Sequence, residues 1–414
     1  MTVDEARGTV FASTGEANHA VKGQNLYCNS ILALDGDTGK LKWFHQLVHH
    51  DIWDLDMPTP PVLVDVRRNG RVIPAVLQTG KMSYVYIFDR VTGEALYGME
   101  ERPVPKSDDP NDEAWPTQPF PLEPGPIGLL SMSRNHINKL TPEIEKYCTD
   151  FWDNNHLMAS QAYPRPRAGF GQVTFPSGVG GPNWGLASYH PQLGFVYVNL
   201  HNTGSYRGAQ PPGTPAPGPM GANNEGAPGA ADGQGRAGGA GRGGGGGRGG
   251  GAAADGAAGP GGGGPGGGGG RGGFSYTLPN GATIPCYAGP YGELVAVNVN
   301  TGAIAWKAVL GINEAYSDLG EKGIKTGARN LGGSIATAGG LLFIGATNDR
   351  RFRAFDAKTG KELWVTELPA SGHSTPVTYM GKDGKQYVVI AASGGTSIGS
   401  NLPISDALVA FRLE

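Results

Sequence analysis

The sequence predicts an all-β protein of the β-propeller type, and three observations support this prediction. The chain has 71 Gly and 32 Pro, and only 17% of its residues are charged. Short runs of Val, Ile, Leu, Phe and Tyr alternate with Gly, Asn, Asp and Pro, as in proteins made of many short strands joined by turns. One motif also occurs four times, and such self-similarity is typical of propellers and solenoids.

Each copy of the motif is expected to form a hairpin. The copies are residues 31–43 (ILALDGDTGKLKW), 85–97 (VYIFDRVTGEALY), 294–306 (LVAVNVNTGAIAW) and 352–364 (FRAFDAKTGKELW). A first strand is followed by a turn in which the Gly of Thr-Gly supplies the positive φ, and then by a second strand that ends in an aromatic residue. A hairpin cannot bury both of its faces alone. We therefore expect repetition around an axis, with the aromatic side chain between neighbouring sheets, although four unrelated hairpins are the alternative.

Long insertions separate the copies, at residues 100–180 and 208–273. The first contains the best helical candidate, residues 137–154, in which Thr141 followed by Pro142 resembles a helix start. The second consists mainly of Gly, Ala, Pro and Arg. It lacks the apolar side chains that would offset the entropy of ordering, so we expect a disordered surface loop within one propeller domain that spans residues 1–414. Its Arg-Gly-Gly repeats are the only feature that suggests RNA binding.

Charge and cysteine usage exclude several classes of protein. The formal net charge is −3, so the net field attracts neither nucleic acid nor an anionic membrane. No apolar run reaches about 18 residues, which predicts no membrane span, and the first residues lack a signal peptide. The three cysteines are too few for a disulfide framework and match neither a metal-binding nor a haem-attachment spacing, although one pair remains open. Cys28, beside a predicted strand, is expected to be a small buried hydrophobe.

Residues 49–56 (HHDIWDLD) combine two histidines, three carboxylates and a tryptophan directly after a repeat. Alternate residues of an extended segment face the same way, so Asp54 and Asp56 are expected to point together, where burial and mutual repulsion would tune a general base. Lys81 lies 27 residues after Asp54 and opens the strand of the next repeat. A lysine near a carboxylate at a propeller axis suits an anionic cofactor. The alternatives are a solvated acidic turn and a surface lysine.

Four runs together resemble the pyrroloquinoline-quinone (PQQ)-dependent dehydrogenases, the quinoproteins. They are residues 49–61 (HHDIWDLDMPTPP), 79–81 (TGK), 181–185 (GPNWG) and 331–343 (LGGSIATAGGLLF). The nearest branch contains membrane-bound glucose dehydrogenase, and the likeness covers essentially the whole chain except the Gly-rich insertion. This family closes about eight blades, whereas the four repeats here predict roughly four to five. We therefore expect the carboxy-terminal portion of a longer protein, whether a truncated gene product, a fragment or half of a split protein.

The resemblance implies a role for each matching residue. Asp54 matches the catalytic base, which also helps to hold Ca²⁺, and Lys81 matches the lysine that contacts the quinone. Asn183 and Trp184 match a cofactor-proximal pair. Glu16 stands where the family often has a calcium-binding asparagine, and its carboxylate is still a hard oxygen ligand for Ca²⁺. His49 or His50 is the second choice for the base.

The resemblance also implies an activity and a setting. The activity is oxidation of a sugar, polyol or alcohol hydroxyl by hydride transfer to PQQ, with Ca²⁺ as the Lewis acid and a quinone or cytochrome as the electron acceptor. The compartment is the periplasm or the exterior, where Cys148, in the first insertion, and Cys286, shortly after the second, are placed to form a disulfide. The alternatives are an inactive fragment, a non-catalytic propeller that serves as an interaction scaffold, and a sugar-binding propeller. Glucose, quinate-like polyols and simple alcohols all remain open as substrates.

Overall fold

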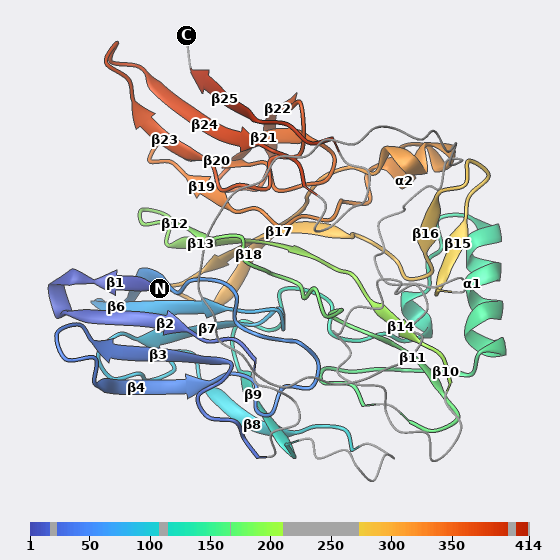
Figure 1. Ribbon diagram of the computed structural model, residues 1–414, viewed down its shortest axis with the longest axis horizontal. Helices are drawn as coiled ribbons and strands as arrows, with labels where there is room; N and C mark the ends of the chain where they lie inside the picture. The colour runs from blue at the N-terminus through green and yellow to red at the C-terminus, as the bar shows by residue number, and fades with distance from the viewer. Residues whose placement is uncertain (17–22, 107–114, 166, 210–272, 396–402, 413–414) are drawn as a thin grey trace, which may run out of the picture.

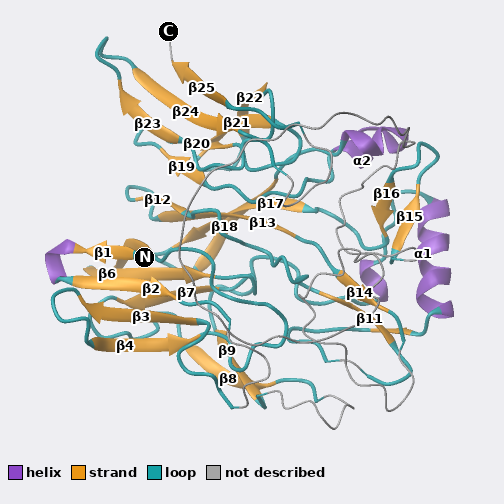
Figure 2. Ribbon diagram, viewed as in Figure 1, coloured by secondary structure: helices purple, strands orange, loops and turns teal. Residues whose placement is uncertain are grey.

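A computed structural model describes residues 1–414 apart from 17–22, 107–114, 166, 210–272, 396–402 and 413–414. Its elements are mostly antiparallel strands, and Figure 2 shows how few helices accompany them. Five sheets follow one another along the chain, and Figure 1 shows the first of them at the lower left and the fifth at the top. We call them the first to fifth propeller sheets.

The first sheet contains β1 (Thr2–Asp4), β2 (Thr9–Ser13), β3 (Ser30–Asp35) and β4 (Leu41–Gln46), and the second contains β5 (Val62–Arg68), β6 (Arg71–Thr79) and β7 (Val85–Asp89). The third contains β12 (Ser188–His190), β13 (Phe195–His201), β17 (Gly292–Asn298) and β18 (Ala303–Val309). The fourth contains β19 (Ser334–Ala336), β20 (Leu341–Ile344), β21 (Arg351–Asp356) and β22 (Glu362–Glu367), and the fifth contains β23 (Val377–Met380), β24 (Gln386–Ala392) and β25 (Ala407–Arg412). The all-β propeller class is confirmed, whereas the number of blades stays a prediction.

In the first three hairpins, the terminal aromatic residue lies on the glycine of the next hairpin's turn. Trp43 Nε1 donates to Arg90 O over 3.1 Å, and a Cβ added to Gly93, whose φ is +76°, would lie 2.8 Å from the Trp43 ring. The same arrangement joins Tyr97 to Val299 and Gly302, and Trp306 to Ala357 and Gly360. The expectation that these aromatic side chains lie between neighbouring sheets is confirmed. Only glycine fits beneath them, because any side chain would occupy the space of the ring.

Apolar side chains fill the spaces between consecutive sheets. One cluster joins Phe11 and Ile31 of the first sheet to Phe88 of the second, and further clusters lie between the later pairs of sheets. On the far face of the fifth sheet, by contrast, Val377, Tyr379 and Leu408 are 56%, 51% and 72% exposed. Each sheet is therefore stabilised mainly by burial against its neighbours, and the fifth sheet has one covered face among the described residues.

Part of the first insertion packs with segments that flank the second and forms a unit on the side of the molecule away from β1 to β4 (Figure 1). It contains α1 (Pro142–Asn154), β10 (Leu157–Met158), β11 (Gly171–Thr174), β14 (Ser205–Arg207), β15 (Ser275–Thr277) and β16 (Thr283–Pro285). The pair β8 (Met99–Pro103) and β9 (Thr117–Pro121) lies nearer the first two sheets, and α2 (Gly320–Ile324) follows the third. A helix exists where the sequence predicts one, but it begins at Pro142, because the Thr141 hydroxyl accepts the Ile144 N–H as a cap.

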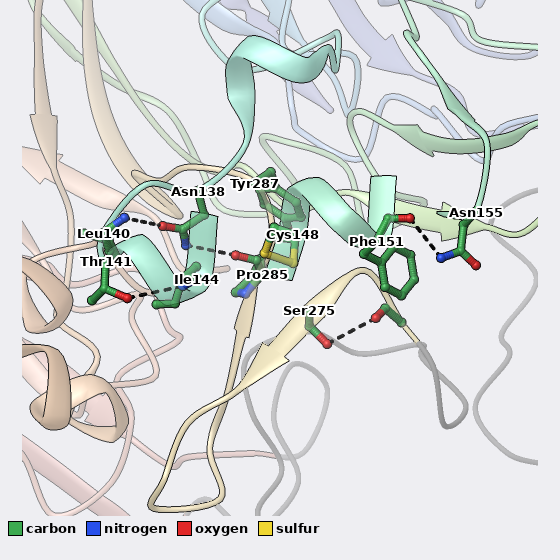
Figure 3. The surroundings of a disulfide bond; sticks show 12 residues. Asn138, Leu140, Thr141, Ile144, Cys148, Phe151, Asn155, Ser275, Pro285 and Tyr287 are labelled. Atoms are coloured by element: carbon green, nitrogen blue, oxygen red, sulfur yellow. Dashed lines mark hydrogen bonds between the residues drawn. A yellow bond between two sulfur atoms is a disulfide. The ribbon is translucent and has the colours of Figure 1, made fainter. Parts of the chain in front are cut away.

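A disulfide joins Cys148 of α1 to Cys286, the residue after β16 (Figure 3). Both half-cystines are fully buried in a cluster that includes Ile144, Trp152 and Phe274. The pairing implied by the resemblance is thus confirmed. Cys28 is only half-buried, so the expectation that it is a buried hydrophobe was wrong.

The expectations about the Gly-rich insertion and about membrane spans can be compared only with the described residues. The Gly-rich insertion at 208–273 lies almost wholly outside them, since residues 210–272 are not described. Within the described part of the chain, no helix is long and apolar enough to cross a membrane.

Candidate functional site

The structure brings together Asp54, Asp56 and Lys81, which flank the second propeller sheet. The two aspartates lie in the segment between β4 and β5, and Lys81 follows β6. Lys81 Nζ lies 2.5 Å from Asp54 Oδ1 and 2.6 Å from Asp56 Oδ1. The backbone fixes this arrangement, because Lys81 N donates to Asp56 O over 3.2 Å. One ammonium group therefore bridges two carboxylates.

The charge of Lys81 is stabilised in spite of its burial. Its side chain is 11% exposed, and those of Asp54 and Asp56 are 26% and 22% exposed. Burial acts to lower the pKa of Lys81, but the charges of Asp56 and Asp54 and their hydrogen bonds outweigh it, so that the net pKa is raised. Lys81 is thus a permanent cation at neutral pH, as the binding of an anionic group requires.

Asp54 has a backbone conformation that is uncommon for a residue with a side chain. Its φ is +62°, and His50 four residues earlier has φ +40°. A non-glycine residue held there costs about 1–3 kcal/mol, and such residues cluster at functional sites. Asp51, between them, is buried, and burial raises the pKa of its carboxyl against the opposing effect of the Trp53 and Leu55 N–H groups. The turn that carries Asp54 therefore contains two residues with positive φ and one buried carboxyl, and contacts with neighbouring residues must stabilise all three.

Two glycines bring a loop of the third sheet against Lys81. Gly181 N donates to Lys81 O over 2.9 Å, and His201 N of β13 donates to Gly181 O over 3.3 Å. A Cβ on Gly180 would lie 2.4 Å from Lys81 Cγ, and one on Gly181 would lie 1.9 Å from Ser83 Oγ. Sequence reasoning used Gly181 only as part of a motif and missed the role of Gly180. The signal was present, since adjacent glycines often mark a close approach of two backbones.

Asn183 and Trp184 follow these glycines in the same loop. Asn183 Nδ2 donates to Val179 O over 2.6 Å, and its Oδ1 accepts the Trp184 N–H over 2.7 Å. The Trp184 side chain is 45% exposed. The amide of Asn183 therefore shapes the loop that contacts Lys81, and Trp184 lies partly exposed on the same loop.

The two histidines are held by contacts with β4, with β8 and with the connection between β2 and β3. His49 Nε2 lies 2.8 Å from Glu101 Oε1, and His49 Nδ1 lies 2.7 Å from Gln46 Oε1. His50 Nδ1 lies 2.7 Å from Asn25 Oδ1. Both ring nitrogens of His49 thus contact residues of β4 and β8. His50 contacts Asn25 through Nδ1 and remains the second candidate for the base.

Glu16 is exposed, and its neighbour Gly15 lies close to Asp56. A Cβ added to Gly15 would lie 3.7 Å from Asp56 Oδ2. No group of three or more His, Cys, Asp or Glu side chains that could hold a metal ion occurs among the described residues. Glu16 and Asp54 remain the predicted calcium ligands, and the chemistry of the available donors fits, because carboxylate oxygens are the ligands that Ca²⁺ prefers.

The fold and the site together define a β-propeller with a lysine–carboxylate cluster at the ends of its strands. Residues 1–238 and 270–388 match the family model described as "Glucose/ethanol/alcohol dehydrogenase, beta-propeller domain", with the short name PQQ. This match covers most of the chain, so the chain belongs to the PQQ-dependent β-propeller dehydrogenase family.

Curated relatives are named as quinone-linked or quinoprotein dehydrogenases. The chain is 31% identical over 428 residues to the quinate/shikimate dehydrogenase (quinone) of Acinetobacter baylyi, a match that covers 100% of this chain and 48% of the relative. It is 30% identical over 404 residues to the quinoprotein glucose dehydrogenase of Escherichia coli K12, with 94% of this chain and 45% of the relative covered. The chain thus spans about half the length of these relatives.

Solved structures support the fold. The quinohemoprotein alcohol dehydrogenase of Comamonas testosteroni superimposes with a TM-score of 0.52 at 21% identity, over 94% of this chain and 43% of that chain. A europium-containing methanol dehydrogenase superimposes with a TM-score of 0.52 at 19% identity, over 95% of this chain and 50% of that chain. At such identities the likeness concerns the fold alone.

Proposed function

We propose that the chain provides catalytic and cofactor-binding residues of a PQQ-dependent dehydrogenase that oxidises a hydroxyl group of a sugar, polyol or alcohol. The observation that supports this most strongly is the contact of Lys81 Nζ with Asp54 and Asp56 at 2.5 and 2.6 Å. An interaction scaffold has no need for a buried cation that bridges two carboxylates, because such groups cost desolvation energy.

The chain's own residues have distinct tasks in this proposal. Asp54 accepts the proton of the substrate hydroxyl as the general base, with His50 as the second candidate. Lys81 places a positive charge beside the reacting oxygens. Asp56 holds the Lys81 ammonium together with Asp54. Lys81, Asn183 and Trp184 would hold PQQ, and Asp54 with Glu16 would hold Ca²⁺. When bound, PQQ supplies the hydride acceptor and Ca²⁺ the Lewis acid.

The names of the relatives narrow the choice of substrates to test. They include dehydrogenases of quinate and shikimate, glucose and glycerol, so we infer a sugar or polyol rather than a small monohydric alcohol as the first substrates to test. A quinone or cytochrome is the proposed electron acceptor. The disulfide Cys148–Cys286 supports an oxidising compartment, for which we propose the periplasm or the exterior.

A dye-reduction assay tests the proposal. The chain is supplied with PQQ and Ca²⁺ and assayed with glucose, quinate, glycerol and ethanol. We expect turnover with at least one substrate, and we expect Asp54→Asn to lower it by about 100-fold or more, because a carboxamide cannot accept the proton. Lys81→Ala should weaken PQQ binding, whereas the control Asp37→Asn, at an exposed turn of the first sheet, should change neither quantity. Turnover unaffected by Asp54→Asn and Lys81→Ala would contradict the assigned roles, and lack of turnover with every substrate would contradict the function.

A further inference from the structure

Asp51 is a buried carboxylate three residues before Asp54 and is not one of the two aspartates that bind Lys81. The residue is 5% exposed. Its Oδ1 accepts the Trp53 N–H over 2.8 Å, and its Oδ2 accepts the Leu55 N–H over 2.7 Å. The donors are the backbone groups on either side of Asp54. One carboxylate therefore holds both ends of the peptide segment that carries Asp54.

The segment needs such support because Asp54 has φ +62°. Side-chain residues leave this region unless the surroundings hold them in it. Trp53 adds a second constraint, since its Nε1 donates to Pro164 O over 2.8 Å and its ring meets that of Tyr163 edge to face, with centroids 5.2 Å apart. The direction in which the Asp54 side chain points is thus fixed from outside the site.

Asp51 also joins the turn to the first propeller sheet. Its Oδ2 accepts from Asn29 Nδ2 over 2.7 Å, and Asn29 N donates to Gly15 O over 2.9 Å. Gly15 is the residue whose neighbourhood includes Asp56 Oδ2. Through its three hydrogen bonds, Asp51 therefore links the turn that carries Asp54 to the connection between β2 and β3, which lies beside Asp56.

We propose that Asp51 is a positioning residue, whose carboxylate holds the backbone on both sides of Asp54 so that the Asp54 side chain meets Lys81. The kinetic consequence rests on the proposed function of Asp54 as the base. The positional statement does not, because it concerns only the contact between Asp54 and Lys81.

Asp51→Asn tests both parts. A carboxamide has one acceptor oxygen, so it cannot accept the Trp53 and Leu55 N–H groups on opposite atoms, and its NH₂ group opposes one of these donors. The contact is measured by carbodiimide cross-linking, which joins a carboxylate to an amine only where the two touch, followed by mass spectrometry. We expect the Asp54–Lys81 cross-link to fall several-fold relative to the exposed pair Lys146–Asp150, whose atoms lie 2.6 Å apart. In the dye assay kcat should fall by roughly 10- to 100-fold with little change in KM, because substrate binding is retained while the base is misplaced.

Two further variants separate positioning from general destabilisation. Asp349→Asn removes another buried carboxylate, paired with Arg353 in the fourth sheet, and should leave the Asp54–Lys81 cross-link and kcat unchanged. Asn29→Gly keeps the left-handed backbone of Asn29, whose φ is +47°, but removes one bond to Asp51, so a smaller decrease of the cross-link is expected. The inference is overturned if Asp51→Asn leaves the cross-link unchanged, if Asp349→Asn lowers it equally or, should Asp51→Asn fail to fold, if Asn29→Gly has no effect. A wild-type chain without turnover would refute the proposed function, and the cross-link would still decide the positional claim.

Discussion

Replacement of Gly180 by alanine tests the view that close packing of the third sheet's loop fixes Lys81. The added Cβ would lie 2.4, 2.5 and 2.8 Å from Cγ, Cβ and Cα of Lys81, where ordinary contacts begin near 3.4 Å. Gly180 also has φ +86°, which penalises any side chain. The backbone conformation costs alanine about 1–2 kcal/mol, and the overlap adds about 1–3 kcal/mol. We therefore expect the free energy of unfolding to fall by about 2–5 kcal/mol.

A matched control isolates the overlap from the backbone effect. Gly70, in the turn between β5 and β6, has φ +72° and nothing within 4 Å of an added Cβ, so Gly70→Ala should cost only about 1–2 kcal/mol in urea unfolding. Relief of the overlap moves Lys81 by about 1 Å, which corresponds to a loss of about 100-fold in dye-linked turnover for Gly180→Ala and none for Gly70→Ala. Equal effects of the two substitutions on stability and turnover would refute the reasoning.

Three other predictions concern the fold. Reduction of Cys148–Cys286, or Cys148→Ala, should lower stability by about 2–5 kcal/mol, measured as the thermal midpoint with and without a thiol reductant; an unchanged midpoint would show that the buried cluster suffices without the bond. His201 is fully buried, and burial together with the Arg329 charge lowers its pKa from 6.5 to about 3. The folded protein therefore keeps His201 neutral over a pH range in which the unfolded chain binds a proton. The free energy of unfolding should decline as pH falls below 6.5 towards 3, by at most about 5 kcal/mol. Urea unfolding of His201→Gln should show a shallower decline, and an identical one would exclude His201 as its source. Trp43→Phe, which leaves the Arg90 carbonyl without its donor, should cost about 1–3 kcal/mol. Trp364→Phe, at a residue that is 39% exposed, should cost less, and equal costs in urea unfolding would contradict the role of the Trp43–Arg90 hydrogen bond.

The hairpins could be predicted because their determinants are local. The turn of each copy uses the side chain of its own first residue, which is an aspartate in three copies and Asn298 in the third, as where Asp35 Oδ1 accepts the Thr38 N–H over 3.0 Å. The partner of each terminal aromatic residue could not be predicted from spacing. Tyr97 donates to Val299, which is 202 residues away, because both insertions lie between the two hairpins. Such pairings depend on which sheets become neighbours, and that follows from burial of whole sheet faces rather than from any local pattern.

The site shows the same division. The contact of Asp54 with Lys81 was expected from residue types and spacing, and so was the shared direction of Asp54 and Asp56. That both carboxylates bind the same ammonium was not expected, since it depends on the bond from Lys81 N to Asp56 O. His49 was a candidate base because isolated imidazole titrates near neutral pH. Its contact with Gln46 is local, at the end of β4, but its contact with Glu101 comes from β8, 52 residues later, which no local pattern indicates.

The geometry of the Asp54–Lys81 pair depends on how the first and third sheets pack against the second. Asp54 is held through Asp51 and Asn29 from the first sheet, and Lys81 is held through Gly181 from the third, although both residues flank the second. The packing of Trp43 on Gly93 holds the second sheet against the first, and the packing of Tyr97 on Gly302 holds the third sheet against the second. A change that widens either gap moves one member of the Asp54–Lys81 pair and not the other. Mutations at these aromatic residues, far from the cluster in sequence, should therefore lower turnover before they unfold the protein, since a displacement of about 1 Å suffices to misplace a base.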